Sequence, residues 1–208
     1  MLHLVRHASP RMDRSCPPWE WGLASSARES ADRLKDVGVL PGGAHWVSSS
    51  EPKAASTAAL LTPTSIRLDD ELREARRDPA FLDVEDLERL VLRSFADVEA
   101  PAADGWEPLA ATRSRVVAAA AAAVTEAPGR DVVLVGHGTA MTMLVAALTG
   151  AGPDVPAWRA MRMPDHCALR WESVEPPPDQ SPEAPPDQRA ARAVPGALLV
   201  AEWGAWAS

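Results

Sequence analysis

Basic residues are scarce in this chain of 208 residues. It has 21 Lys and Arg against 29 Asp and Glu, a formal net charge of −8 and a pI of about 5.1. Nucleic-acid-binding proteins carry a basic patch or stripe that attracts phosphates. We therefore expect no nucleic-acid partner, and an anionic small molecule would have to be attracted by arginines placed locally.

Long apolar runs and cysteines are scarce as well. The longest apolar run, residues 116–124, is far shorter than the roughly 20 residues that cross a bilayer, and Arg6 and His7 interrupt the apolar start before a signal peptide could form. Cys16 and Cys167 are the only cysteines and have no metal-ligand spacing. We expect a cytoplasmic protein with free thiols, no membrane partner, no metal and no cofactor.

The remaining composition is that of an ordinary globular protein. Hydrophobic residues make up 46% of the chain and charged residues 24%, and the length suits one fairly large domain over residues 1–208. Tyrosine is absent and tryptophan occurs eight times. Together with many Ala, Arg and Pro, this is typical of a GC-rich coding sequence, such as that of a high-GC bacterium.

Strand and helix patterns alternate along the chain, which predicts an α/β fold: a three-layer α/β/α sandwich with a mostly parallel central sheet. The segment 25–38 has Ser25 or Ser26 as a helix cap and Gly38 at its end. The segment 83–98 places Leu87, Leu90, Val91 and Phe95 on one helical face. We also expect strands at 3–5, 44–47, 65–69, 131–136, 167–174 and 197–203, and helices at 51–62, 111–127 and 138–149.

A proline-rich segment interrupts the last two predicted strands. Residues 175–187 hold six prolines in thirteen residues. Such a composition favours extended, solvated chain, so we expect a surface loop or linker. A docking role for this loop is the weaker alternative.

Two of the predicted strands end in histidine. His7 follows the first strand directly after Arg6, and His137 follows the strand at 131–136 between Gly136 and Gly138. Ligand sites in open α/β sheets gather beyond the carboxyl ends of strands, and a helix that starts there offers its N-terminus to an anion. The pattern predicts a phosphate pocket lined by these charged and imidazole groups.

Three other interpretations of the histidines were weighed. Either histidine alone is more often a structural, hydrogen-bonded group, but two in such settings are harder to explain that way. Zinc needs three or four regularly spaced ligands, and the sequence has neither HxxxH nor CxxC. A serine-hydrolase elbow fails because Gly138 stands where the nucleophile would be.

In five segments the chain resembles the histidine phosphatase superfamily, whose fold is that of cofactor-dependent phosphoglycerate mutase. The segments are Arg6-His7-Ala8, "WGLASSARESA" (21–31), "SSSEPKAASTA" (48–58), "ELREA" (71–75) and "VLVGHG" (133–138). No single segment is specific to this family, but the occurrence of all five in this order over residues 2–150 is. The resemblance implies a nucleophile at His7, a general acid at Glu74 with Glu71 as rival, and phosphate contacts from Arg6, Lys53, His137 and Gly138.

Each of these implied roles has a physical basis. A neutral His7 would attack phosphorus, with its other ring nitrogen fixed by a backbone carbonyl. Positive groups would stabilise the transferring phosphoryl group, and His137 would do so best when protonated. We also expect substrate contacts from Ser9, Arg11, Arg14 and Trp21.

The sequence departs from the family pattern at four positions, one of which is Ala27, where the second segment usually has glycine. Lys53 replaces an arginine and loses the planar fork that binds two oxygens, although Arg28 or an arginine of residues 73–77 could compensate. Asp13 stands where many relatives carry asparagine, and an acid there would repel phosphate unless it points away. Ala8 replaces a glycine, which is a milder change.

We expect a metal-independent phosphomonoesterase acting on a small phosphorylated metabolite, with a homodimer as the default assembly. The segment between Lys53 and Val133 leaves little room for the lid that a phosphomutase needs to exclude water. The alternatives are a catalytically weakened phosphate-binding relative, a phosphomutase, and a protein phosphatase that docks through the proline-rich loop.

Overall fold

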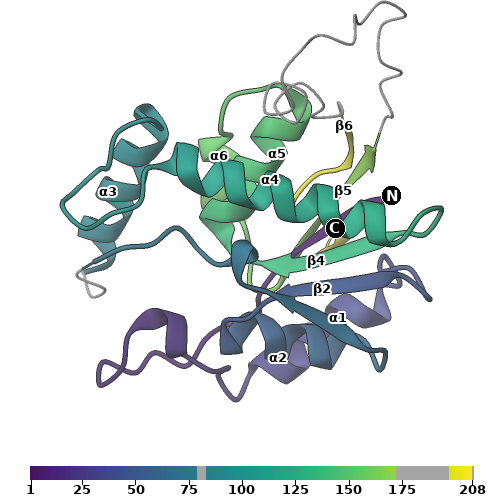
Figure 1. Cartoon of the computed structure of the whole chain (residues 1–208). Helices are drawn as coiled ribbons and strands as arrows, with labels where there is room; N and C mark the ends of the chain where they lie inside the picture. The colour runs from purple at the N-terminus through teal and green to yellow at the C-terminus, as the bar shows by residue number, and fades with distance from the viewer. Residues whose placement is uncertain (79–82, 172–196, 208) are drawn as a thin grey trace, which may run out of the picture.

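A six-stranded sheet forms the centre of the computed structural model, which describes residues 1–78, 83–171 and 197–207 (Figure 1). The strand order is β3-β2-β4-β1-β5-β6. Strands β3, β2, β4 and β1 run parallel, and β5 is antiparallel to β1 and β6. The strands are β1 (Leu2–Arg6), β2 (His45–Ser49), β3 (Ile66–Asp69), β4 (Val132–Gly136), β5 (Asp165–Trp171) and β6 (Ala197–Ala201).

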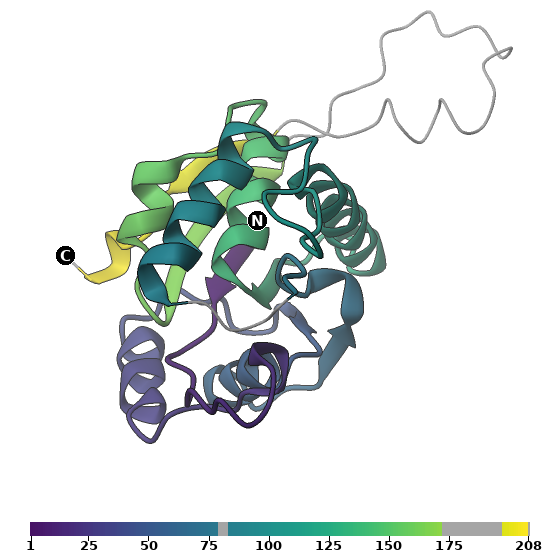
Figure 2. The ribbon, with the colours of Figure 1, turned by 90° about the vertical axis from the view of Figure 1, so that its left-hand side faces the viewer.

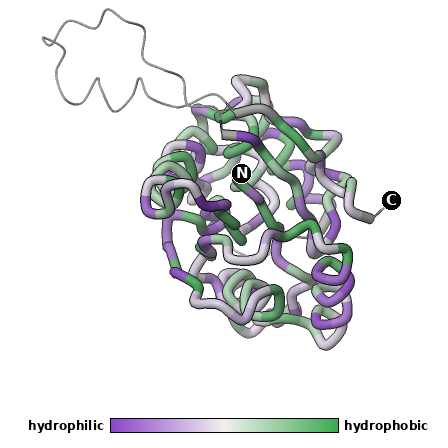
Figure 3. The backbone as a smooth tube through the Cα atoms, turned by 90° about the vertical axis from the view of Figure 1, so that its right-hand side faces the viewer, coloured by the Kyte–Doolittle hydropathy of each residue, from purple (hydrophilic) through white to green (hydrophobic). Residues whose placement is uncertain are grey.

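Helices cover both faces of this sheet and make the three layers. On one face, α1 (Ala27–Asp36) and α2 (Pro52–Leu61) pack on Val5, Val133 and Val135. On the other face, α4 (Leu109–Glu126) and α5 (Gly138–Thr149) pack on Leu2, Leu4 and Leu134. Alternate residues of the central strands therefore serve two different cores, and Figure 3 shows hydrophobic segments in the middle of the molecule.

A third cluster extends the fold beside α5. Helices α3 (Val84–Ala96) and α6 (Val155–Ala160) contribute Leu90, Val91, Phe95 and Trp158, and Met143 of α5 joins them. Short 3₁₀ turns lie at η1 (Pro18–Glu20), η2 (Asp70–Leu72) and η3 (Ala205–Ala207). In Figure 2 the segment that follows β1 runs from the sheet to the side of the molecule on which α1 and α2 lie.

The predicted α/β/α sandwich with a mostly parallel sheet is confirmed. Gly38 ends α1 with a φ of 73°, and Pro52 occupies the first turn of α2. The serine cap of α1 differs from the expectation, because Ser26 stands at the N-cap with helical backbone angles and makes no capping hydrogen bond. The proline-rich segment 175–187 lies outside the described residues, and no helix within the described ranges is long and apolar enough to cross a membrane.

Candidate active site

The two histidines predicted from the sequence lie side by side at the carboxyl edge of the sheet. Strands β1 and β4 are parallel neighbours with Arg6 opposite Gly136, so the residues that follow them, His7 and His137, emerge together. Their ring centroids are 5.1 Å apart at an interplanar angle of 62°. His7 is 6% exposed and His137 is fully buried.

His7 is held in the form that a nucleophile needs. Its Nδ1 lies 2.8 Å from the Ala8 carbonyl oxygen. A carbonyl only accepts, so Nδ1 carries the proton and Nε2 keeps its lone pair. Burial, followed by the effect of His137, lowers the pKa of His7 well below its usual value. The expected backbone carbonyl is therefore that of Ala8, and Thr57 of α2 fixes this residue by accepting a hydrogen bond from its backbone N–H at 2.9 Å.

His137 offers one nitrogen to the protein and leaves the other free. Its Nε2 lies 2.9 Å from Ser49 Oγ and 3.5 Å from Glu51 Oε1. Its Nδ1 is buried and has no hydrogen-bond partner in the described part of the chain. Burial lowers the pKa of His137 to about 3, against the opposing charge of Glu74. The protonated state of His137 was expected beside a bound phosphate, and it stays a prediction.

Arg6 points its guanidinium into the same place. Its Nη1 donates to the Met161 carbonyl at 2.8 Å, while its buried Nε has no partner among the described residues. A Cβ at Gly138 would lie 3.3 Å from this Nε and 3.5 Å from Trp158 Nε1. The glycine thus provides room for the arginine, whose buried Nε–H is a donor that an anion can use.

Lys53 lies in the site but is already paired. It is 7% exposed, its Nζ forms a short ion pair with Glu51, and it donates to the Pro18 carbonyl at 2.7 Å. Glu51 is 6% exposed. Lys53 therefore differs from the free phosphate-binding cation that the sequence predicted, since its charge is balanced by a neighbouring carboxylate.

Glu74 occupies the helix N-terminus that was expected to receive an anion. Its carboxylate accepts from Thr139 N at 3.2 Å and Ala140 N at 3.0 Å, at the start of α5, and Arg77 lies 3.8 Å away. Burial acts to raise the pKa of Glu74, but the charge of Arg77 and the backbone N–H groups outweigh it and lower the pKa to about 2.

Through these hydrogen bonds Glu74 caps the start of α5. The rival, Glu71, is exposed. The assignment of the general acid to Glu74 stays a prediction.

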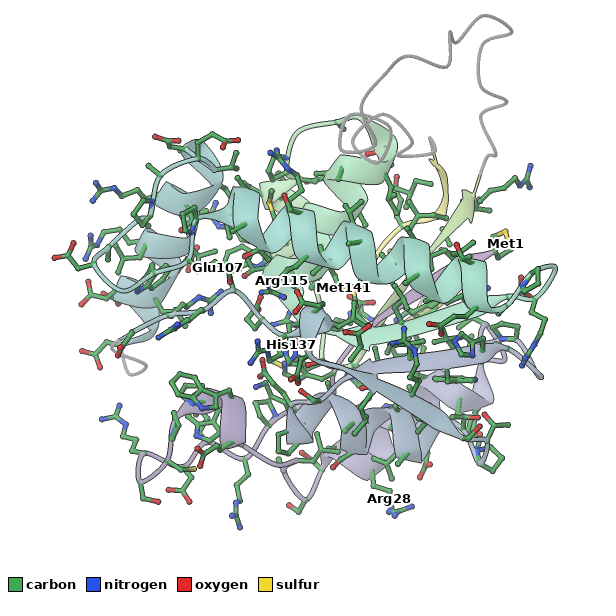
Figure 4. All side chains as sticks on the ribbon, in the orientation of Figure 1. Met1, Arg28, Glu107, Arg115, His137 and Met141 are labelled. Carbon is green, nitrogen blue, oxygen red and sulfur yellow. The ribbon has the colours of Figure 1, made fainter. Side chains whose placement is uncertain are left out.

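Arg77 is the arginine of residues 73–77 that reaches this site. Its Nη2 donates to Thr139 Oγ1 at 2.8 Å, and its guanidinium lies over the Trp106 ring, 5.3 Å from the centroid. Arg28 does not compensate for Lys53: it is exposed, and Figure 4 shows it on the outer side of the lower helices, away from His137. Arg115 donates to the carbonyls of residues 71, 73 and 74 and so fixes the backbone that carries Glu74.

The loop after His7 is held by its own hydrogen bonds. Trp21 Nε1 donates to the carbonyls of Asp13 and Cys16, at 2.7 Å and 3.2 Å, and Arg11 and Arg14 are exposed. The Ser9 carbonyl accepts from Ala24 N at 2.9 Å. The Asp13 carboxylate accepts from Ser15 N and Ser15 Oγ, so it caps a turn. The substrate contacts expected of Ser9, Arg11, Arg14 and Trp21 stay predictions.

Three residues of the site were missed in the sequence: Ser49, Glu51 and Thr57. All three lie in the segment 48–58, whose serines and charges were noted only as a family pattern. The adjacency of Glu51 and Lys53, two residues apart at a helix start, was a readable signal for an ion pair. Nothing in the sequence marked Arg77 among its arginine neighbours.

Comparisons with known proteins agree with this geometry. A family model described as the histidine phosphatase superfamily (branch 1) matches residues 2–177. A mycobacterial glucosyl-3-phosphoglycerate phosphatase structure is 25% identical, with a TM-score of 0.64 over 81% of this chain and 88% of that one. A phosphoglycerate mutase structure from Thermus thermophilus is 28% identical, with a TM-score of 0.56 over 82% and 92%. A search of curated proteins gives no match.

Proposed function

The chain belongs to the histidine phosphatase superfamily (branch 1), and on that basis we propose that it is a phosphomonoesterase that hydrolyses a small phosphorylated metabolite through a phosphohistidine on His7. The observation that carries the proposal is the pair of rings at the sheet edge. His7 is neutral with its Nε2 lone pair available, and beside it His137 Nδ1 and Arg6 Nε are buried with no hydrogen-bond partner among the described residues. These groups supply a nucleophile and two contacts for a phosphoryl group.

The reaction then proceeds in two displacements at phosphorus. The Nε2 lone pair of His7 attacks, the bond to the leaving oxygen breaks, and that oxygen takes up a proton as the alcohol departs. Water next attacks phosphorus, the phosphorus–nitrogen bond breaks as the new phosphorus–oxygen bond forms, and inorganic phosphate and free His7 are released. Arg6 acts throughout as the charge that stabilises the phosphoryl oxygens.

Hydrolysis is favoured over phosphoryl transfer to a second substrate by the short chain between Lys53 and Val133, which leaves little room for a closing lid. One structural relative is described as a phosphatase and another as a mutase, so the comparisons leave this choice to experiment.

The test is hydrolysis of p-nitrophenyl phosphate with and without EDTA. We expect activity that EDTA leaves intact, that His7→Gln abolishes, and that a matched change at the amino end of β2, His45→Gln, does not affect. Complete loss on chelation would contradict metal independence, and unchanged activity in His7→Gln would contradict the assigned nucleophile.

A weakened, phosphate-binding protein is the second candidate, and one observation favours it. Lys53, in place of the family's arginine, is paired with Glu51 and Pro18 and does not stand free in the site. If the wild type is inert and Lys53→Arg restores turnover, this second candidate is correct.

A further inference from the structure

Arg115 of α4 is a largely buried cation that the proposed reaction does not use. Its Nε and Nη2 donate to the two carboxylate oxygens of Glu107, at 3.0 Å and 3.1 Å, and its side chain is 15% exposed. Nη1 donates to the carbonyls of Glu71 and Arg73, both at 2.7 Å, and Nη2 also donates to that of Glu74 at 3.0 Å. A guanidinium has five N–H groups, so the protein itself uses the whole donor set and leaves none for a ligand.

Glu107 holds the arginine in place and is itself tied to the same segment. Its Oε2 accepts from Arg76 N at 2.9 Å, and its backbone N–H donates to the Arg76 carbonyl at 2.9 Å. In Figure 4 the side chains of Glu107 and Arg115 lie beside each other, toward the edge of the sheet that carries His137. The pair therefore joins α4 to residues 71–76 through five contacts of one guanidinium and two of one backbone.

The segment that this pair holds is the one that carries Glu74. The Glu74 N–H donates to Glu51 Oε1 at 2.9 Å, and the Glu74 carbonyl accepts from Arg115. Its carboxylate reaches the first turn of α5, the helix that directly follows His137. The backbone of Glu74 is thus fixed on both sides of the residue, and this sets the direction of its side chain toward the histidines.

We propose that Arg115 is a positioning residue for Glu74, and that by holding the carbonyls of residues 71, 73 and 74 it places the Glu74 carboxyl group within reach of the leaving oxygen of the substrate. The proposal rests on the proposed phosphatase function and on the general-acid role expected of Glu74. Proton transfer needs the two heavy atoms about 2.6–3.2 Å apart, and a misplacement of about 1 Å can cost about a hundredfold in rate.

The proton balance of the reaction shows which substrates depend on this placement. In the first displacement the Glu74 carboxyl group gives its proton to the leaving oxygen, and in the second the resulting carboxylate takes a proton from the water that attacks phosphorus. p-Nitrophenolate is a good leaving group that departs without a proton. Phenol is as weak an acid as the tyrosine side chain, with a pKa of about 10, so phenolate needs the proton. A displaced carboxyl group should therefore slow phenyl phosphate more than p-nitrophenyl phosphate.

The test compares kcat/KM for these two esters, because this ratio reports the steps up to formation of the phosphohistidine. Glu74→Gln removes the acid, and we expect it to lower kcat/KM for phenyl phosphate by about a hundredfold or more and for p-nitrophenyl phosphate by less than about tenfold. This variant defines the leaving-group signature of a lost general acid, against which a change at Arg115 is compared.

Arg115→Lys keeps the charge but loses the planar fork that spans the carbonyls. We expect kcat/KM to fall at least about tenfold for phenyl phosphate and less than about threefold for p-nitrophenyl phosphate. In the Glu74→Gln background the same change should add less than about threefold for either ester, because the group that Arg115 positions is gone. Arg113→Lys alters an exposed arginine of the same helix, paired with Glu99, and should leave both values within about twofold of the wild type.

Inhibition by inorganic phosphate shows whether the pocket of each variant is intact, and in Arg115→Lys it should stay within about twofold of the wild type. Glu107→Gln weakens the same clamp and should show the same preference with a smaller loss, so it carries the test if Arg115→Lys does not fold.

Equal losses for the two esters in Arg115→Lys would show a merely structural role and overturn the proposal. It would also be overturned by unchanged values in Arg115→Lys, by its full loss reappearing in the Glu74→Gln background, or by a Glu74→Gln variant without the leaving-group preference. A wild type that hydrolyses neither ester would contradict the phosphatase function and this proposal with it. A wild type that hydrolyses both keeps that function whatever the Arg115 variants show, so the two failures can be told apart.

Discussion

Replacing Glu74 with glutamine should weaken the fold in a way that depends on pH. The carboxylate caps α5 through Thr139 and Ala140 and lies beside Arg77, and its pKa falls from 4.5 to about 2. Each pKa unit is equivalent to about 1.4 kcal/mol, so a shift of this size contributes about 3 kcal/mol of stability at pH 7. The side chain is 21% exposed, so solvent screening removes little of this.

The sign of the pH dependence follows from the direction of the shift. The folded pKa is depressed, so the stabilisation is complete above the unfolded pKa of 4.5 and is lost as pH falls through about 2. The cost of Glu74→Gln should therefore be about 3 kcal/mol at pH 7 and roughly half of that at about pH 3.

Urea unfolding followed by tryptophan fluorescence at several pH values measures this cost directly. Glu71→Gln is the matched control, because Glu71 is exposed three residues away; it should change stability by less than about 0.5 kcal/mol. A cost for Glu74→Gln below about 1 kcal/mol at pH 7, or one of equal size at low pH, would show that the ionised cap does not stabilise the fold as described.

Three further predictions concern other positions. Lys53→Met leaves the buried Glu51 carboxylate unpaired and should lower the free energy of unfolding by about 3–5 kcal/mol in urea titrations; an unchanged midpoint would contradict the buried pair. In Gly105→Ala the new Cβ would lie 2.6 Å from the Asp78 carbonyl oxygen, at a residue whose φ is +78°. The substitution should lower the free energy of unfolding by at least about 1–3 kcal/mol and speed hydrogen exchange in the surrounding loop. Wild-type stability and exchange would contradict this prediction. Burial and the neighbouring histidine of β1 lower the pKa of His166 to about 4, so the wild type should lose up to about 3 kcal/mol as pH falls from 6.5 to about 4, and His166→Gln should show a flatter slope; an identical slope would contradict it.

The fold could be predicted from the sequence because the patterns that specify its helices and strands are local. Periodicity or backbone freedom specifies single elements, as in the apolar strands that end in polar residues, the alanine-rich helix at 109–126 and the glycine at 38. The order of these elements then leaves few ways to build an α/β sheet. The pairing of His7 with His137 follows for the same reason, since parallel neighbours deliver their carboxyl ends to one edge.

The protonation states within the site were not readable, because they depend on contacts between distant segments. Complete burial lowers the pKa of His137, which the sequence alone does not indicate. The N–H groups of α5, some 65 residues away in the sequence, help to lower the pKa of Glu74. A side chain's identity gives its chemistry, whereas its charge depends on which groups the fold brings within about 4 Å.

A phosphohistidine on His7 is the central claim, and rapid quenching tests it most directly. The wild type is mixed with ³²P-labelled p-nitrophenyl phosphate, quenched in base within one turnover and digested for mass spectrometry. We predict one acid-labile phosphoryl group on His7, absent from His7→Gln and retained in His45→Gln. Turnover without a labelled wild-type enzyme, or a label that persists in His7→Gln, would contradict the account.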